Sequence, residues 1–237
     1  MDIKSYKKNY DYSYTFGMFP TVELIQSKPD KVIKVLVSSH YKSESDTDIF
    51  ELCKRYNIKT EINDKAINRI SDKENNYVVG VFYKYDCVLN NDESHIVLVN
   101  PSNMGNMGTI IRTLTGFGLN NLAVISPGVD VFDPKVLRAS MGSLFRINFK
   151  YFDSFDSYKE KFYNRKIYTF MLDGATSLKN LKHDSNELFS LVFGNEATGL
   201  DSSFSSVGTS VFIKHTDRID SLNLTIAAGI AMYHFCS

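Results

Sequence analysis

Residues 96–117 read IVLVNPSNMGNMGTIIRTLTGF. The first four form an unbroken apolar run, which is typical of a strand buried on both faces of a parallel sheet. A loop rich in glycine and asparagine follows, and the sequence then predicts a helix from about Gly108 to Phe117. A buried strand that leads through a tight loop into a helix is the repeating unit of an α/β fold.

The alternation of strand and helix continues on both sides of this stretch. Downstream, strands are predicted at 122–126, 145–151, 167–172, 188–193 and 211–213, and helices at 134–139, 155–163 and 221–235. Upstream, strands are predicted at 32–37, 58–62 and 77–85, and helices at 46–56 and 64–70. The polar segment 86–94 is interpreted as a linker. We therefore expect a small α/β domain at 1–88 and a second α/β domain, with a mostly parallel sheet, at 94–237.

The composition is that of an ordinary globular chain, with 237 residues of which 43% are hydrophobic and 23% charged. Its 27 basic residues balance 27 acidic ones, which argues against a protein that coats nucleic acid by charge alone but allows a local basic face. No apolar run approaches the roughly 20 residues of a membrane span, so we expect no membrane partner.

The cysteines and histidines indicate neither a disulfide framework nor a metal site. Cys53, Cys87 and Cys236 include no CxxC pair, which fits a reducing compartment. The five histidines share no metal-ligand spacing. We therefore expect a cytoplasmic protein without a metal ion.

The first group of polar candidates follows the 96–99 strand. Glycines there let the backbone approach a ligand, and the start of the helix offers N–H groups to an anion. Asn106 and Arg112 are six residues apart, so they converge only if Asn106 lies in the loop and Arg112 on the helix. Arg112 either holds an RNA phosphate or ribose, or is a solvated residue. The loop fits neither GxGxxG nor a Walker pattern, which disfavours a nucleotide-binding oxidoreductase or kinase.

The second group is LVFGNEATGL at 191–200, where an apolar strand runs into two glycines that flank Glu196. A buried carboxylate is costly unless it is paired, and Arg112 is a natural partner. The backbone at Gly194 could contact an adenosine. The other interpretation is a surface turn with an exposed glutamate.

The third group is SLNLTIAAGI at 221–230. Ser221 is a plausible helix N-cap, which would place Asn223 in the first turn, close to unpaired N–H groups. The small residues 227–229 permit close helix packing, either in the core or between subunits.

Together these segments resemble the three signature motifs of the SpoU (TrmH) family in the SPOUT superfamily of RNA methyltransferases. The resemblance covers about residues 94–237 and rests on GNMGTIIRT, LVFGNEATGL and SLNLTIAAGI occurring in this order. The segment LRASMG at 137–142 resembles a further family segment. Residues 16–85 more loosely resemble the small amino-terminal RNA-binding domain of the family, which is like certain ribosomal proteins.

The resemblance implies an α/β SPOUT domain with a trefoil knot, S-adenosyl-L-methionine as cofactor, and a homodimer with its active site near the subunit interface. It implies methylation of a ribose 2′-hydroxyl in RNA, and the amino-terminal domain favours rRNA over tRNA. By motif position, the catalytic residues would be Arg112, Asn106, Glu196, Ser221 and Asn223. The cofactor-binding residues would be Leu172, Gly194, Asn195, Gly199, Ile213 and Leu222.

Two positions depart from the family pattern. Lys214 and His215 follow Ile213 where the family usually has Pro, so the loop 214–220 is expected to be shaped differently. Ala197 stands where Gly is common. The alternative function is a non-catalytic RNA-binding or assembly protein that keeps the fold.

The role of Arg112 has two interpretations. An arginine is a poor base because its pKa exceeds about 12, so we favour stabilisation of the developing alkoxide charge. A phosphate-assisted arginine base is the rival interpretation.

Overall fold

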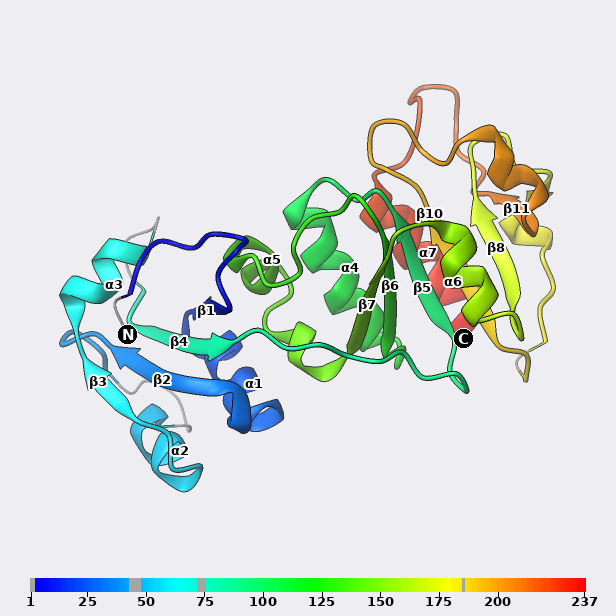
Figure 1. Cartoon of the computed structure of the whole chain (residues 1–237). Coiled ribbons are helices and arrows are strands. Elements are labelled where there is room, and N and C mark those ends of the chain that lie inside the picture. Colours follow the sequence, from blue (N-terminus) through cyan, green and yellow to red (C-terminus); the bar gives the residue numbers. More distant parts are fainter. Residues whose placement is uncertain (1–2, 43–47, 72–75, 185) are drawn as a thin grey trace. The chain divides into compact units, whose positions relative to one another are not determined.

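The computed structural model describes residues 3–42, 48–71, 76–184 and 186–237 (Figure 1). The chain forms two compact units. Unit 1 comprises Met1–Tyr85 and Asp130–Arg146, and unit 2 comprises Asp86–Val129 and Ile147–Ser237. The predicted domains were continuous in sequence, whereas the units are not: residues 130–146, expected in the second domain, pack with the amino-terminal residues.

Unit 1 is built on a four-stranded sheet with the spatial order β1-β4-β2-β3. Its strands are β1 (Tyr12–Phe16), β2 (Val32–Val37), β3 (Thr60–Ile62) and β4 (Val78–Tyr83). Its helices are α1 (Met18–Ser27), α2 (Ile49–Arg55), α3 (Asp64–Ile70) and α5 (Pro134–Ala139), with 3₁₀ turns at Pro29–Lys31 and Ser143–Arg146. The sequence predicted neither β1 nor α1. Residues 46 and 47 of the predicted 46–56 helix lie outside the described residues.

Helices cover both faces of the unit 1 sheet because apolar side chains alternate along its strands. On one face, Val35 and Val78 pack with Ile25 of α1. On the other face, Val79 packs with Ile67 of α3.

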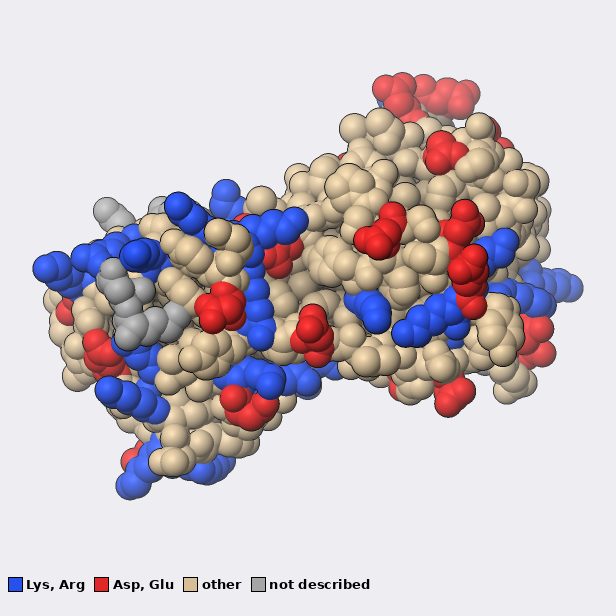
Figure 2. Space-filling view, in the orientation of Figure 1, with Lys and Arg blue, Asp and Glu red and all other residues tan. Residues whose placement is uncertain are grey.

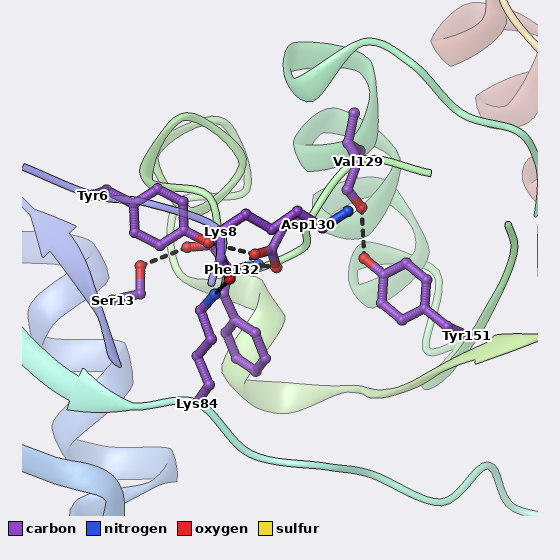
Figure 3. A network of polar contacts seen from close by, with 8 residues as sticks. All are labelled: Tyr6, Lys8, Ser13, Lys84, Val129, Asp130, Phe132 and Tyr151. Carbon is purple, nitrogen blue, oxygen red and sulfur yellow. Dashed lines mark hydrogen bonds and ion pairs between the residues drawn. The ribbon is translucent and has the colours of Figure 1, made fainter. Parts of the chain in front are cut away.

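Polar contacts hold the start of the 130–146 segment in unit 1 (Figure 3). The carboxylate of Asp130 accepts hydrogen bonds from the hydroxyl of Tyr6 and from the ammonium of Lys84, the latter at 2.9 Å. The hydroxyl of Ser13 donates to the backbone oxygen of Phe132 at 2.5 Å. Asp130 and Lys84 are mostly buried, so the pair is shielded from solvent and fixes this segment against β1 and β4.

Unit 2 contains a seven-stranded sheet with the spatial order β7-β6-β5-β10-β8-β11-β9. Its strands are β5 (His95–Val99), β6 (Asn121–Ile125), β7 (Asn148–Phe152), β8 (Lys166–Phe170), β9 (Thr176–Ser177), β10 (Phe189–Phe193) and β11 (Thr209–Phe212). All neighbouring pairs are parallel, which confirms the predicted parallel sheet.

Helices cover both faces of the unit 2 sheet (Figure 1). They are α4 (Met104–Gly116), α6 (Phe155–Lys161) and α7 (Leu224–Cys236), with 3₁₀ turns at Leu178–Asn180 and Ser202–Ser206. Helices α4 and α7 pack together on one face, and α6 packs on the other. The trefoil knot stays a prediction.

No helix within the described ranges is long and apolar enough to cross a membrane.

Candidate active site

The first two sequence motifs meet at one edge of the unit 2 sheet. They follow β5 and β10, which are hydrogen-bonded neighbours. The carboxyl ends of parallel strands lie at the same edge, where α/β proteins usually bind their ligands. The loops after these strands are therefore brought side by side, although they are more than 90 residues apart in sequence.

The side chain of Glu196 joins the two loops. Its Oε2 accepts hydrogen bonds from the backbone N–H (3.0 Å) and the hydroxyl (2.8 Å) of Ser102. Its Oε1 accepts from the backbone N–H of Asn103 (3.1 Å) and from Nδ2 of Asn106 (3.4 Å). Burial raises the pKa of the Glu196 carboxyl, but these hydrogen bonds outweigh burial and hold the pKa below its usual value. Glu196 is therefore a carboxylate at neutral pH.

The predicted pairing of Glu196 with Arg112 is wrong for a single chain. The partners of Glu196 are Ser102, Asn103 and Asn106. Arg112 lies exposed on α4, and no hydrogen bond or ion pair joins it to Glu196 in the described part of the chain. Backbone N–H groups satisfy the carboxylate, so an arginine is not needed for that purpose.

The predicted start of the first helix is also wrong. Helix α4 begins at Met104, because the side chain of Asn103 caps it and accepts a hydrogen bond from the backbone N–H of Asn106 at 3.0 Å. Asn106 is therefore a helical residue rather than a loop residue. Arg112 comes six positions after Asn106 in the same helix, a rotation of about one and two-thirds turns, so the two side chains leave α4 in different directions.

The loop after β10 is closed by two glycines. Asn195 and Gly199 exchange backbone hydrogen bonds of 3.2 and 2.9 Å, and Gly199 has a positive φ of 69°. A Cβ on Gly194 would lie 2.1 Å from the carbonyl carbon of Gly199, so only glycine fits there. The side-chain amide of Asn195 donates to the backbone oxygen of Asn100 at 2.7 Å. The polar atoms of Asn195 thus hold the loop together.

The third motif begins α7 differently from the prediction. Asn223, and not Ser221, is the N-cap: its Oδ1 accepts from the backbone N–H (2.8 Å) and the hydroxyl (2.6 Å) of Thr225. Ser221 lies before the helix and is exposed. The capping asparagine satisfies an N–H group that no residue inside the helix can satisfy.

A pocket of about 400 Å³ opens beside these three motifs. Ligand pockets commonly measure about 300–1,000 Å³, so this one can hold a small molecule. It is lined by all six residues expected to bind a cofactor, namely Leu172, Gly194, Asn195, Gly199, Ile213 and Leu222. Glu196 and Ser221 also line it, whereas Asn106, Arg112 and Asn223 do not.

The sequence did not identify two contributors to this site, Ser102 and Asn103, which bind the Glu196 carboxylate. The only signal for Asn103 was its residue type, since asparagine is a common N-cap. The described ranges contain no group of His, Cys, Asp and Glu side chains that could hold a metal ion.

The model of the SpoU rRNA Methylase family matches residues 93–233. The chain belongs to this family. The match contains all three motifs and the pocket-lining residues named above. It also contains β5 and β10, the two strands whose following loops Glu196 joins.

Relatives of this SpoU family member include the 23S rRNA (guanosine(2553)-2′-O)-methyltransferase of Bacillus subtilis. The two are 30% identical over 133 residues, which are 55% of this chain and 52% of that protein. The chain spans about half the length of the first curated relatives that it matches.

Solved structures confirm the fold. The AdoMet-bound rRNA methyltransferase from Sinorhizobium meliloti is 23% identical, with a TM-score of 0.80 over 95% of this chain and 87% of that one. A structure solved for the 2-OH methylation of C/U34 on tRNA is 27% identical, with a TM-score of 0.56 over 62% of this chain and 95% of that one. The two therefore share the α/β architecture of the SpoU family with this chain.

Proposed function

We propose that this protein transfers a methyl group from S-adenosyl-L-methionine to a ribose 2′-hydroxyl in RNA. The observation that carries the proposal is a pocket at the carboxyl edge of a parallel sheet, which residues of the second and third motifs line and to which Glu196 joins the first motif by hydrogen bonds. Membership of the SpoU family and the 2′-O-methyltransferase activity named for the Bacillus relative support it.

The pocket suits such a cofactor chemically. Apolar side chains, among them Leu172, Ile213 and Leu222, offer contacts to a flat adenine ring. The carboxylates of Asp173 and Glu196 give the pocket a negative potential, which suits a cationic sulfonium. When bound, the cofactor would supply an electrophilic methyl group with a thioether as its leaving group. Backbone groups around Gly194 and Gly199 would hold its polar atoms.

The residues of this chain have to handle the proton and the charge of the sugar hydroxyl. A 2′-hydroxyl is a weak nucleophile until it loses its proton, and an arginine has a pKa above about 12. We assign to Arg112 the stabilisation of alkoxide charge and the holding of the adjacent phosphate. Glu196 would position Asn106 and the start of α4, and Ser221 and Asn223 would complete the polar site.

The proposed active form is a homodimer. Three exposed apolar residues form a stripe on one side of α7: Ile226, Ile230 and Tyr233, which are 54%, 40% and 65% exposed. Burial in a second copy would remove this stripe from water. Helix α4, which carries the exposed Arg112, packs beside α7, so the dimer would bring Arg112 to the site of the partner.

The dimer can be tested with a matched pair of variants. Ile230→Glu should convert the dimer to a monomer in light scattering after gel filtration, because it buries a charge in the interface. Ile62→Glu is the control, since Ile62 is equally apolar, 65% exposed and located on β3. A monomeric wild-type protein would contradict the proposed dimer.

Unit 1 is proposed as the RNA-binding part. It contains 17 basic and 14 acidic residues, whereas unit 2 contains 10 basic and 13 acidic residues. The formal charges are thus +3 and −3, a separation that the zero net charge of the whole chain does not reveal. Figure 2 shows lysine and arginine side chains spread over unit 1. Positive potential attracts the phosphate backbone of RNA. We favour rRNA over tRNA as the substrate because of the resemblance of the amino-terminal residues to the RNA-binding domain of the family.

Location in the cytoplasm belongs to the same proposal. Cys53, Cys87 and Cys236, all in the described part of the chain, form no disulfide. Reduced cysteines are the rule in that compartment.

One experiment tests the reaction itself. Ribose-methylation mapping of total RNA from cells with and without the gene should reveal one nucleotide that loses its 2′-O-methyl group. The same RNA segment with a 2′-deoxy target should not be methylated by the purified protein, because the accepting oxygen is absent. Methylation of the deoxy substrate would point to a base as the acceptor. A pure RNA-binding or assembly protein would bind no S-adenosyl-L-methionine in calorimetry.

A further inference from the structure

His215 is a pocket residue that no motif assignment explains. It lies in the loop after β11, is half-buried, and lines the pocket together with Ile213 and Leu222. Its ring nitrogen Nδ1 is 2.9 Å from the backbone oxygen of Ile213. A carbonyl oxygen only accepts hydrogen bonds, so Nδ1 must carry the hydrogen.

This hydrogen bond determines what the other ring nitrogen can do. In a neutral imidazole with hydrogen on Nδ1, the second nitrogen Nε2 has a lone pair and acts as an acceptor. Within the described residues, no hydrogen bond of Nε2 of His215 is found. The backbone of Ile213 thus fixes the orientation of the ring, and Nε2 is the atom with which a neutral His215 would accept a hydrogen bond in the pocket.

The same bond lies at the loop where the sequence departs from the family pattern. Lys214 stands where the family usually has Pro, which would restrict the backbone by its ring. Here the side chain of His215 restrains the backbone by bonding to Ile213, two residues earlier. One side chain thus shapes the turn and presents a polar atom at the pocket.

We infer that His215 is a specificity residue for the cofactor, with Nε2 accepting a hydrogen bond from an N–H or O–H group of an adenosine moiety. The inference rests on the proposed function. Adenosine offers an amino group and two ribose hydroxyls as donors. The two other ionisable side chains of the pocket, Asp173 and Glu196, are carboxylates suited to a cationic group.

The inference predicts a pH-dependent affinity. Histidines change charge between about pH 5 and 8, whereas carboxyl groups titrate near pH 4. Protonation of His215 would remove the acceptor at Nε2 and add a positive charge to the pocket that would hold the cationic cofactor. The loop of His215 also carries the charged residues Lys214, Asp217, Arg218 and Asp220.

The experiment measures dissociation constants by calorimetry between pH 8 and 5.5 for S-adenosyl-L-methionine and S-adenosyl-L-homocysteine. The second ligand has the same adenosine but a neutral thioether. For the wild-type protein, acidification should raise the dissociation constant of S-adenosyl-L-homocysteine about two- to tenfold, which corresponds to the loss of one hydrogen bond. The dissociation constant of S-adenosyl-L-methionine should rise by more, because this ligand is a cation. His215→Gln should bind both ligands at pH 8, and its dissociation constants should not change with pH, since glutamine accepts hydrogen bonds but does not titrate.

Two further variants make the result decisive. His215→Ala should bind both ligands more weakly at pH 8, also with a flat profile. His234→Gln is the control, because His234 lies on α7 outside the pocket lining, and it should keep the wild-type slope. Equal slopes for wild type and His215→Gln would overturn the inference and leave the proposed function intact. Failure of the wild-type protein to bind either ligand would overturn the proposed function itself.

Discussion

The carboxylate of Glu196 lies 3.0 Å from the backbone nitrogen of Ser102 and 2.8 Å from its hydroxyl oxygen. This contact joins the loop after β10 to the loop after β5. The carboxylate is partly buried, which raises its pKa, but its hydrogen bonds to Ser102 and Asn103 outweigh burial and lower the pKa below its usual value. Glu196 is thereby a structural anchor of the pocket as well as a candidate member of the reaction site.

Glu196→Gln should destabilise the protein, because an amide NH₂ would then face backbone N–H groups that need an acceptor. We expect a loss of about 1–3 kcal/mol in the free energy of unfolding. The pKa of Glu196 is lower in the folded than in the unfolded state, so its contribution is present above the unfolded pKa and disappears as the pH falls through the folded one. Urea unfolding between pH 7 and 3 should therefore show less acid sensitivity in the variant.

Glu160→Gln serves as the control for this measurement. Glu160 is exposed on α6, and its substitution should change the free energy of unfolding by less than about 0.5 kcal/mol. If both variants show the wild-type pH dependence, the hydrogen bonds to Glu196 do not stabilise the fold.

The two glycines of the 194–199 loop should respond differently to alanine. In Gly194→Ala the new Cβ meets backbone atoms of Gly199 at 2.1 Å, which no side-chain rotation can relieve. We expect a loss of about 3 kcal/mol, the upper end for overpacking, together with loss of cofactor binding. In Gly199→Ala the Cβ meets no atom within 4 Å, so only the positive φ costs energy, about 1–2 kcal/mol. Thermal unfolding and calorimetry would show whether this order holds.

Arg112→Ala should separate chemistry from stability. Arg112 is exposed, so its substitution should change the free energy of unfolding by no more than about 0.5 kcal/mol. Cofactor affinity should be preserved, because Arg112 does not line the pocket. Methylation should fall by about 10²–10³, the usual effect of removing one group that stabilises developing charge. Arg112→Lys keeps the charge but not the planar fork and should recover only part of the rate. Near-normal turnover of Arg112→Ala would remove this residue from the mechanism.

Local patterns predicted much of unit 2, because buried parallel strands have strong sequence signatures. The residues that line its pocket were expected from the resemblance to the SpoU family. Local patterns failed where contacts between distant residues, or interactions that compete with local preference, determine the structure. Glycines at 105 and 108 suggested a loop, since glycine is a poor helix former. Burial of Ile110, Ile111 and Leu114 and the cap from Asn103 outweigh that preference, so α4 begins at Met104. The partners of Glu196 could not be read from a spacing of more than 90 residues.

The placement of residues 130–146 is a second case in which sequence patterns were insufficient. Their contacts reach residues more than 110 positions away, such as that between Ser13 and Phe132. The apolar periodicity of α5 required a buried face, but it did not indicate which sheet would cover that face.

This placement predicts the behaviour of a truncated protein. Removal of residues 1–93 leaves the predicted second domain but strips the 130–146 segment of its partners. The ring centroids of Phe145 and Phe82 lie 5.2 Å apart, so the ring of Phe145 would become exposed. The buried side chains of Val136 and Leu137 would become exposed as well. Fragment 94–237 should therefore bind a hydrophobic dye and aggregate.

A second fragment makes this prediction specific. Replacing residues 130–146 of fragment 94–237 by a short Gly/Ser linker removes the same apolar side chains while keeping the whole unit 2 sheet. This fragment should bind less dye and remain in solution at concentrations where the first precipitates. If both fragments behave alike, the 130–146 segment does not depend on unit 1 for its burial.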